Sequence, residues 1–429
     1  MAQVQHNGGL AGKPAAASQR VLIIGGGYGG LRAALKLAQL KRRTAAVPLE
    51  IVLLDVNDYH QVITELHQVA GGRATAESVR VPFAKILRST GVRFVQARVV
   101  QFDFAQQRVI VETKADGVTS KGAIPYRWLL LALGSTTAFF GIPGLKEHAF
   151  TIKSAGEASR VAAQMLTNFQ AATALPVGEQ RQGLLTFVVG GGGFSGVELA
   201  GEFAERIASL CQQFSIPRAE VKLLIIEAQS QVLPGYPDWM VQYAAQSLAK
   251  LGVTVVTGDP VAAVQADSFS LKSGRTIPNG LLVWTGGVEA VSEARQAGAA
   301  TGRGGRVVVN EYLEATDYPG VFAIGDNGIA ADSSRALPPS AQIALQQAET
   351  VAANIFAQAG GQQRREEFRP NVVGEVISIG SRDAIANLES GVKLTGIPAT
   401  VLKNLIEQRY RLSLSKGPLG DLAMISNFI

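Results

Sequence analysis

Two glycine-rich turns carry the clearest chemical signal in this sequence of 429 residues. Each turn follows an apolar run, precedes a segment with helical apolar periodicity, and has the spacing G-x-G-x-x-G. The glycines are Gly25, Gly27 and Gly30 in the first turn, and Gly191, Gly193 and Gly196 in the second. Between a strand and a helix, this spacing gives a tight turn, close approach to a pyrophosphate and close helix packing, with the phosphate at the helix N-terminus. The repeat therefore predicts two dinucleotide sites.

An acidic residue follows each glycine turn at the end of a second apolar run. Asp55 ends the run at residues 49–55, and Glu227 ends the run at residues 221–227. A carboxylate in this position accepts hydrogen bonds from ribose hydroxyl groups. The alternative is that the turns and acids serve structure only, but the same pattern occurs twice in the same order. Two nucleotide sites in one chain indicate electron transfer between two cofactors.

The residues after Glu227 bear on which nicotinamide nucleotide is preferred. They are Ala228, Gln229, Ser230 and Gln231, so no arginine is present to receive a 2′-phosphate. The carboxylate would repel that phosphate and hydrogen-bond a free hydroxyl instead. The sequence therefore predicts NADH rather than NADPH at the second turn.

Composition excludes several classes of protein. Hydrophobic residues make up 47% of the chain and charged residues 17%, which excludes disorder throughout. Cys211 is the single cysteine, so redox chemistry must reside in a bound cofactor; its place on an apolar helical stripe predicts a buried thiol. The net charge of +6 is compatible with anionic lipid, while the arginine pairs at 42–43 and 364–365 lack interleaved aromatic residues, so no nucleic acid is expected. No apolar run is long enough to span a bilayer, and residues 1–18 are expected to be a mobile tail.

Two later segments indicate which nucleotide binds where. Residues 128–136 form an apolar run that reaches Gly134, and residues 317–327 form a run that reaches Asp326. Both resemble the segments that close the FAD site in flavoprotein reductases with two dinucleotide-binding domains, where the aspartate binds the ribityl chain. The resemblance implies an α/β fold with two Rossmann-like domains. An FAD domain at residues 19–148 and 285–340 is split by an NADH domain at 149–284, and residues 281–288 form the returning strand.

The segment at residues 337–355 contains the pattern A-Q-x-A-x-Q and makes the resemblance specific. It resembles the helix beside the flavin in the type II NADH dehydrogenases, and further matching stretches lie at residues 57–72, 188–202, 232–237 and 374–386. The resemblance runs from about residue 20 to the C-terminus. It is closer to the bacterial enzymes than to the plant and fungal forms, because no calcium-binding loop interrupts the sequence.

This resemblance assigns roles to individual residues. Ala341 and Gln342 would lie beside FAD, Gly286 and Glu198 beside NADH, and Gln342, Gln346, Lys403 and Ile406 beside a quinone. Gln342 and Gln346 are also four residues apart on one helix face, where neutral amides can hydrogen-bond a quinone carbonyl or, alternatively, the backbone. Glu198 lies in the first turn of its helix. Either the helix dipole alone accounts for an acid there, or Glu198 positions NADH or relays a proton.

The C-terminal region, residues 341–429, is expected to combine the quinone-site helix with a membrane anchor. Val401, Leu402, Leu405 and Ile406 share one helical face, and residues 393–416 hold five basic side chains against one acid. Leu419, Leu422, Ile425 and Phe428 recur at intervals of three. Two short amphipathic segments with basic edges predict an in-plane anchor on anionic lipid. The alternatives are a dimer interface or a lid on the flavin domain.

The leading hypothesis is FAD-dependent oxidation of NADH with two-electron reduction of a membrane quinone, menaquinone or ubiquinone, without proton pumping. A homodimer on the cytoplasmic side of the cell membrane is expected, attached peripherally to the lipid bilayer surface. The alternatives are an NADH reductase of a soluble carrier such as ferredoxin or rubredoxin, and an NADH-sensing flavoprotein binding module. No metal site is expected, because His60 and His67 fit packing or hydrogen-bonding roles.

Overall fold

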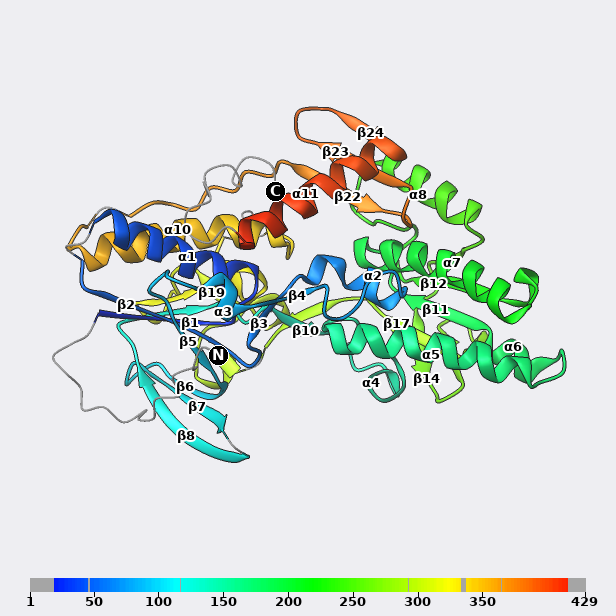
Figure 1. Cartoon of the computed structure of the whole chain (residues 1–429), viewed down its shortest axis with the longest axis horizontal. Coiled ribbons are helices and arrows are strands. Elements are labelled where there is room, and N and C mark those ends of the chain that lie inside the picture. Colours follow the sequence, from blue (N-terminus) through cyan, green and yellow to red (C-terminus); the bar gives the residue numbers. More distant parts are fainter. Residues whose placement is uncertain are drawn as a thin grey trace.

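The computed structural model describes residues 19–44, 47–115, 117–291, 293–332, 337–363 and 365–415. Two α/β domains lie side by side, and the C-terminal helix runs from the second domain back to the first (Figure 1). The expected tail at 1–18 and the expected amphipathic segment at 418–429 fall outside the described residues. Among the helices that are described, none combines the length and apolar character needed to cross a bilayer.

The first domain is built on a parallel sheet of five strands in the order β20-β9-β1-β2-β5. The strands are β1 (Gln19–Ile24), β2 (Leu49–Asp55), β5 (Arg93–Gln96), β9 (Trp128–Leu131) and β20 (Val321–Ala323). Nearly continuous apolar runs such as residues 21–24 suit such a sheet, because both of its faces are covered. Two helices, α1 (Tyr28–Arg43) and α10 (Ala341–Ala359), pack together in the same hydrophobic core.

An antiparallel sheet of three strands joins this core. Its strands are β6 (Arg98–Asp103), β7 (Arg108–Ala115) and β8 (Val118–Pro125). Phe102, Val109 and Ile124 from these strands are buried with the residues of the parallel sheet. The sheet extends away from the rest of the first domain in Figure 1.

The second domain repeats the architecture with four parallel strands in the order β13-β12-β11-β17. The strands are β11 (Thr186–Gly190), β12 (Lys222–Glu227), β13 (Thr254–Thr257) and β17 (Leu281–Trp284). Its helices are α5 (Ala155–Thr173), α6 (Glu179–Leu184), α7 (Phe194–Phe214) and α8 (Asp238–Lys250), and its antiparallel sheet is β14 (Val261–Val264), β15 (Ser268–Leu271) and β16 (Thr276–Pro278). The predicted α/β class with Rossmann-like parallel sheets is confirmed for both halves.

The chain crosses between the domains twice, and the two crossings pair with each other. β10 (Ser135–Thr137) and β18 (Val288–Ala290) form an antiparallel pair. The next helix, α4 (Leu145–His148), buries Leu145 against Val188 and Ile226 of the second domain. In the structure α4 thus packs against the second domain, and the predicted division of the chain, with its boundary at residue 148, stays a prediction.

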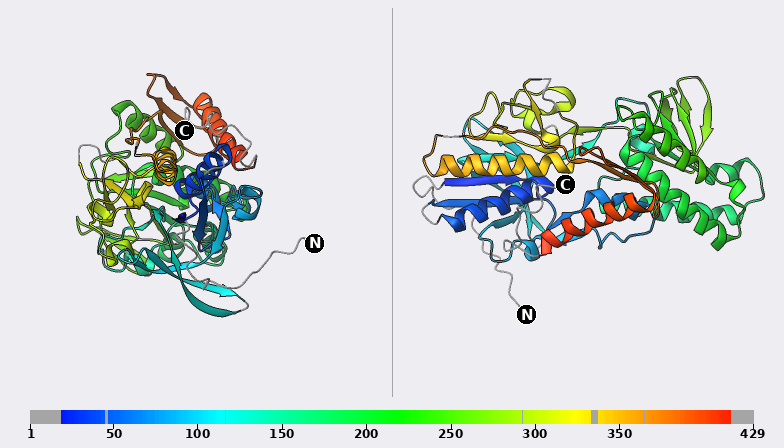
Figure 2. Two further views of the ribbon diagram at one scale, coloured as in Figure 1. Left: turned by 90° about the vertical axis from the view of Figure 1, so that its left-hand side faces the viewer. Right: turned by 90° about the horizontal axis from the view of Figure 1, so that it is seen from above.

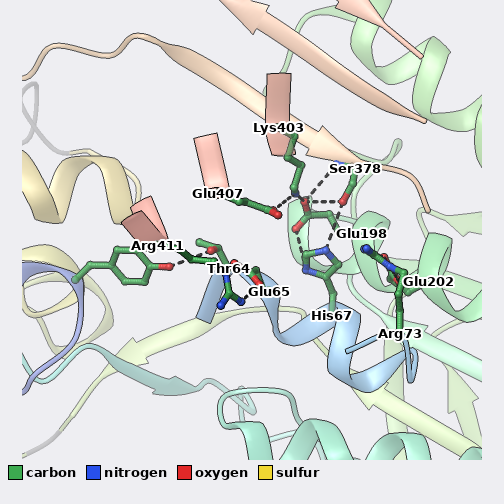
Figure 3. Close-up of polar contacts among 11 residues, drawn as sticks. Thr64, Glu65, His67, Arg73, Glu198, Glu202, Ser378, Lys403, Glu407 and Arg411 are labelled. Atoms are coloured by element: carbon green, nitrogen blue, oxygen red, sulfur yellow. Dashed lines mark hydrogen bonds and ion pairs between the residues drawn. The ribbon is translucent and has the colours of Figure 1, made fainter. Parts of the chain in front are cut away.

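Short elements complete the described chain. They are β3 (Tyr59–Gln61), η1 (Ile63–Glu65), α2 (Leu66–Ala70), β4 (Arg80–Pro82), α3 (Phe83–Ile86), η2 (Arg218–Glu220), α9 (Glu293–Gln296), η3 (Arg303–Gly305), β19 (Val307–Val309), η4 (Gly325–Asn327) and β21 (Gly328–Ala330), where η marks a 3₁₀ helix. Of these, η1 and α2 matter most for the site, because η1 carries Glu65, which binds Arg411 of the C-terminal helix, and α2 carries His67, which lies near Glu198 of α7 (Figure 3).

The C-terminal region connects the two domains. An antiparallel sheet, β22 (Gly374–Ser378), β23 (Ala384–Leu388) and β24 (Lys393–Thr395), precedes α11 (Ile397–Ser415). Ile377 and Ile385 of this sheet belong to the core of the second domain, while Tyr410 and Leu414 of α11 belong to the core of the first. Figure 2 shows α11 crossing the space between the two domains.

Candidate active site

The first glycine turn forms an open cradle at the start of α1. Gly25 has a φ of +99°, and a Cβ on Gly30 would lie 1.8 Å from the carbonyl oxygen of Gly25. Gly27, the residue before the helix, has nothing within 4 Å of the position of a Cβ. Side chains at positions 25 and 30 are thus excluded by strain and collision, while the backbone at position 27 is free for a ligand. This geometry fits a pyrophosphate at the helix N-terminus.

Asp55 is fixed beside this turn by backbone donors. Its Oδ2 accepts a hydrogen bond from Gly26 N–H at 2.6 Å, and its Oδ1 accepts one from Asn57 N–H at 2.8 Å. Burial raises the pKa of Asp55, and these hydrogen bonds partly oppose the shift. Oδ1 also accepts from the Asn57 side-chain amide at 3.4 Å, but Oδ2 keeps a further lone pair, so the carboxylate can still accept a ribose hydroxyl.

The second turn reproduces the first. Gly191 has a φ of +110°, and a Cβ on Gly196 would lie 1.9 Å from the carbonyl oxygen of Gly191. Glu227 accepts hydrogen bonds from Gly192 N–H at 2.6 Å and from Gln229 N–H at 2.7 Å. Two further predicted residues belong to this turn. Gly193 precedes α7, and Gly286 packs against Gly191, because a Cβ on Gly191 would lie 2.7 Å from the Cα of Gly286.

A polar cluster joins the first crossing to η4. Ser135 Oγ donates to Asp326 Oδ2 at 2.5 Å, and Lys153 Nζ donates to Ser135 Oγ at 2.9 Å. Gly134 N–H donates to the side-chain oxygen of Asn327 at 3.0 Å. Burial lowers the pKa of Lys153, while Asp326 and Glu157 act in the opposite direction. Sequence reasoning identified Gly134 and Asp326 but missed Lys153, which lies between α4 and α5.

A cavity of about 680 Å³ connects these features with the C-terminal helix. The predicted site residues that line it are Gly25, Gly27, Asp55, Gly134, Glu198, Asp326, Ala341, Gln342, Lys403 and Ile406. The predicted residues that lie outside its lining are Gly30, Gly191, Gly193, Gly196, Glu227, Gly286 and Gln346. The cavity thus joins the first turn to residues from α7, α10 and α11, while the second glycine turn lies beyond it.

The two predicted glutamines of α10 make different contacts in the structure. Gln342 lines the cavity, but Gln346 hydrogen-bonds the backbone of Asn371 through both of its amide atoms, at 2.7 and 2.8 Å. For Gln346 the backbone-bonding alternative therefore describes the observed contacts. The same segment continues to Val373 and Gly374, which line the cavity, so Gln346 holds a part of the chain that leads to the wall.

A group of charged side chains closes the cavity where α7, α2 and α11 meet (Figure 3). Lys403 of α11 forms an ion pair with Glu198 of α7, and Ser378 donates to the same carboxylate from its backbone N–H at 3.2 Å and from its hydroxyl at 3.1 Å. His67 Nδ1 lies 3.7 Å from Glu198. Burial alone would raise the pKa of Glu198, but Lys403, His67 and Ser378 together hold it below its usual value.

Two further contacts join α11 to the first domain. Arg411 donates to the Glu65 carboxylate of η1 from Nε, at 2.8 Å, and from Nη2, and Tyr410 hydrogen-bonds His60 Nε2 at 2.9 Å. His60 Nδ1 lies 2.9 Å from the carbonyl oxygen of Gly26, which can only accept, so Nδ1 carries the proton and Nε2 accepts from Tyr410. The sequence-based hypothesis of a hydrogen-bonding His60 agrees with these contacts.

The predicted basic edge of α11 differs from the structure. Lys403 and Arg411 were expected among the charges that meet lipid headgroups, but they point inward and bind Glu198 and Glu65. Lys403 and Arg411 turn inward because each pairs with a largely buried carboxylate on another element. Lys416, the last of the five expected basic residues, lies outside the described residues.

Besides Lys153, sequence reasoning missed the roles of two residues at or near the site. His67 was placed in a packing or hydrogen-bonding role without its charged neighbours, and Glu407 was treated as one polar residue of an amphipathic helix. Glu407 lies 3.9 Å from Lys403, four residues away on α11. The spacing of Lys403 and Glu407 was the available signal. Cys211 is buried as predicted, and burial raises the pKa of its thiol.

Comparisons with known proteins agree with this arrangement. The family model for pyridine nucleotide-disulphide oxidoreductases matches residues 19–348. A type II NADH:quinone oxidoreductase of Staphylococcus aureus (strain NCTC 8325 / PS 47) is 32% identical over 399 residues, covering 91% of this chain and 94% of that protein. The corresponding protein of Staphylococcus epidermidis is 32% identical over 396 residues, with the same coverage of both chains.

Solved structures share the fold. The structure of NDH2 from Plasmodium falciparum in complex with NADH superposes with a TM-score of 0.81 at 17% identity, covering 96% of this chain and all of that one. The sulfide:quinone oxidoreductase of Aquifex aeolicus superposes with a TM-score of 0.75 at 18% identity, covering 95% and 94%. The family match over residues 19–348, together with 32% identity over nine-tenths of the chain, identifies this chain as a member of the pyridine nucleotide-disulphide oxidoreductases and, within them, of the type II NADH:quinone oxidoreductases.

Proposed function

We propose that this chain oxidises NADH and reduces a membrane quinone by two electrons, with FAD as its resident cofactor. The observation that carries the proposal is the cavity of about 680 Å³, whose wall combines the first glycine turn with Gln342, Glu198 and Lys403. A nucleotide cradle and a set of hydrogen-bond donors for a second ligand therefore share one space. Membership of the type II NADH:quinone oxidoreductases supports the same reaction.

The residues of the first domain fit FAD. The open backbone at Gly27 would receive the pyrophosphate, Asp55 would bind the ribose, and Asp326 would bind the ribityl chain. Gly134 and Ala341 line the same cavity and would lie along the cofactor. When bound, FAD supplies the two-electron chemistry that links a hydride donor to a quinone.

The second turn fits NADH. Glu227 is held by two backbone N–H groups and keeps lone pairs that a free ribose 2′-hydroxyl can reach, while its charge disfavours a 2′-phosphate. Phe194 and Thr285 extend the cavity wall from this turn toward Glu198. The nicotinamide would therefore enter the shared cavity from the side of α7.

The quinone would lie between α10 and α11. Gln342 offers a neutral amide donor, Lys403 offers an ammonium group, and Ile406 contributes an apolar wall. Glu198 holds the Lys403 ammonium in place through their ion pair, so its proposed role is to position Lys403 rather than to carry a proton, since its pKa is lowered. For Gln346 a direct contact with quinone remains a sequence-based prediction.

The outer face of α11 fits the surface of a lipid bilayer. Ile397, Val401 and Leu405 are spaced by four residues and expose 71, 52 and 57% of their surfaces, and Leu412 is also exposed. Such a row suits an in-plane contact with lipid, on the helix whose inner face lines the cavity. A peripheral position on the cytoplasmic side of the cell membrane belongs to this proposal, and the homodimer remains an expectation. Leu405→Glu should weaken sedimentation with anionic vesicles, while Gln170→Glu at an exposed position of α5 serves as the charge-matched control.

Turnover of the purified, FAD-loaded protein tests the function. NADH is mixed with short-chain ubiquinone, short-chain menaquinone or a ferredoxin, and nicotinamide absorbance is followed. We expect rapid turnover with at least one quinone and none with the soluble carrier. Reduction of the bound flavin without turnover would support the NADH-sensing module instead, and turnover with ferredoxin alone would support the soluble-carrier reductase.

A further inference from the structure

Glu407 lies in the cavity wall, and the proposed reaction gives its carboxyl group no role. It lies on α11, its side chain is 16% exposed, and its Oε1 atom is buried. Among the described residues, no hydrogen-bond partner reaches this atom; Lys403 Nζ lies 3.9 Å away, beyond hydrogen-bonding distance. Figure 3 shows the Glu407 side chain directed toward Lys403 and Glu198.

The charged groups that face Glu407 are already committed to other partners. Lys403 is paired with Glu198, and loss of its proton would leave that buried carboxylate without a cation. Glu65 is bound by Arg411, and Arg73 by Glu202. These groups surround Glu407 from η1, the segment after α2, α7 and α11 itself.

The remaining neighbours have no proton to give near neutral pH. The pKa of Glu198 is lowered, so its carboxyl group is ionised. Burial is the largest cause of the fall in the pKa of His67 to about 4, so its ring is neutral. Loss of the second ring proton would create an imidazolate, which is not accessible to a histidine without a metal.

Glu407 differs from these neighbours in its readiness to exchange a proton. Burial raises its pKa to about 7; Lys403 opposes the shift, Glu65 and Glu198 add to it, and Arg73 opposes it. The acid form therefore predominates below about pH 7 and the carboxylate above it. A general acid is most effective when its pKa lies near the working pH.

We propose that the Glu407 carboxyl group delivers to the bound quinone the one proton that the reaction takes from the medium. The inference rests on the proposed function. NADH supplies two electrons and one proton, and the quinone needs two electrons and two protons to become the quinol. As the second quinol O–H bond forms, the O–H bond of Glu407 breaks, and the resulting carboxylate takes a proton from water. Lys403 stays charged throughout and holds the quinone oxygen by a hydrogen bond.

The test compares Glu407→Gln and Glu407→Asp with the wild type and with Glu389→Gln, an exposed glutamate on the turn between β23 and β24 that serves as the charge-matched control. Stopped-flow absorbance separates reduction of the flavin by NADH from its reoxidation by a short-chain quinone. In the wild type and the control, we expect reoxidation to slow by about tenfold per pH unit above about pH 7, because the acid form of Glu407 is required.

The variants should change reoxidation alone. Glu407→Gln keeps the shape but has no acidic proton, so reoxidation should be slower by about 100-fold at pH 6 and should lose its dependence on pH. Glu407→Asp should restore a pH-dependent phase at a lower rate. A Glu407→Gln variant that keeps the rate and pH profile of the wild type would overturn the inference, as would a rise in the KM for quinone with the pH profile of kcat unchanged.

A measurement without turnover gives an independent check. Infrared spectra of the FAD-loaded protein should show a protonated-carboxyl C=O band that titrates near pH 7 in the wild type and is absent in Glu407→Gln. If the band is the same in both proteins, the inference fails even where the variant is poorly active. If wild-type flavin is reduced by NADH but reoxidised by no quinone at any pH, the proposed function itself fails.

Discussion

Replacing Lys403 with methionine should destabilise the protein more than replacing its partner Glu198 with glutamine. Both side chains are largely buried, with 12 and 14% exposed. Removal of one partner from a buried ion pair typically costs about 3–5 kcal/mol, because the other charge stays buried without compensation. The slight exposure places Lys403→Met near the lower end, at about 3 kcal/mol of unfolding free energy.

The asymmetry comes from the second carboxylate beside Lys403. In Glu198→Gln, Lys403 still has Glu407 at 3.9 Å, a separation worth about 4 kcal/mol of Coulomb energy at an effective dielectric constant of about 20. In Lys403→Met, the Glu198 carboxylate keeps only Ser378 and a neutral His67. We therefore expect Glu198→Gln to cost about 1–2 kcal/mol, since Lys403 loses a hydrogen bond to a charged partner but its buried charge is still partly compensated by Glu407.

The pH dependence of the two variants has a definite sign. The pKa of Glu198 is lowered in the native protein, so its contribution to stability is complete above the unfolded value and is lost as the pH falls through the native one. In Lys403→Met, burial dominates and raises this pKa, so stability should fall as the pH rises from about 5 to 8. The double variant Glu198→Gln/Lys403→Met keeps Glu407 and removes the Glu198 charge. Its difference in stability from Lys403→Met therefore measures the cost of the Glu198 carboxylate left without Lys403.

Urea unfolding of the FAD-loaded protein at several pH values measures these differences. We expect the double variant to be more stable than Lys403→Met at pH 8 and nearly equal to it at pH 5. If the two single substitutions act additively at all pH values, Lys403 and Glu198 do not stabilise each other and the reasoning is wrong.

Three further predictions concern the nucleotide and quinone sites. Gly30→Ala should prevent correct formation of the first turn, because its Cβ would lie 1.8 Å from a backbone oxygen, whereas Gly27→Ala should fold and yet lose bound flavin, measured as flavin per chain. Glu227→Ala should narrow the preference for NADH over NADPH by about tenfold in kcat/KM, because a charged hydrogen-bond acceptor is lost. Gln342→Ala should slow reoxidation by quinone by about three- to tenfold, and Gln346→Ala by less, since its amide binds backbone; the reverse order would restore Gln346 to the quinone site.

The nucleotide half of the site was predictable from the sequence because its signals are local. A strand, a glycine turn and the first helical turn occupy a few consecutive residues, and the acid ends the neighbouring strand. The hydrogen bonds from Gly26 to Asp55 and from Gly192 to Glu227 show that the two signals meet in space as the motif requires. The geometry of such a motif is set by its own residues, so it can be predicted without knowing how the rest of the chain packs.

The quinone half was less predictable because it depends on which elements dock. Gln342 and Gln346 share one helix face in the sequence, but the segment near Asn371 covers only the second of them. Periodicity likewise placed Lys403 and Arg411 on a polar face without saying whether that face meets water or the carboxylates of other elements. The buried acids that decide this, Glu198 and Glu65, lie 205 and 346 residues away in the chain.

The position of α11 explains how a membrane contact and a proton-handling site can share one helix. Side chains two positions apart on a helix point about 200° apart, so Val401 and Leu405 face outward while Lys403 and Glu407 face the cavity, within a helix diameter of about 10 Å. The helix is held from both sides: Lys403 binds the second domain, and Arg411 and Tyr410 bind the first. Contact of the outer row with lipid, as proposed, would therefore leave Lys403 and Glu407 in place in the cavity wall beside Glu198.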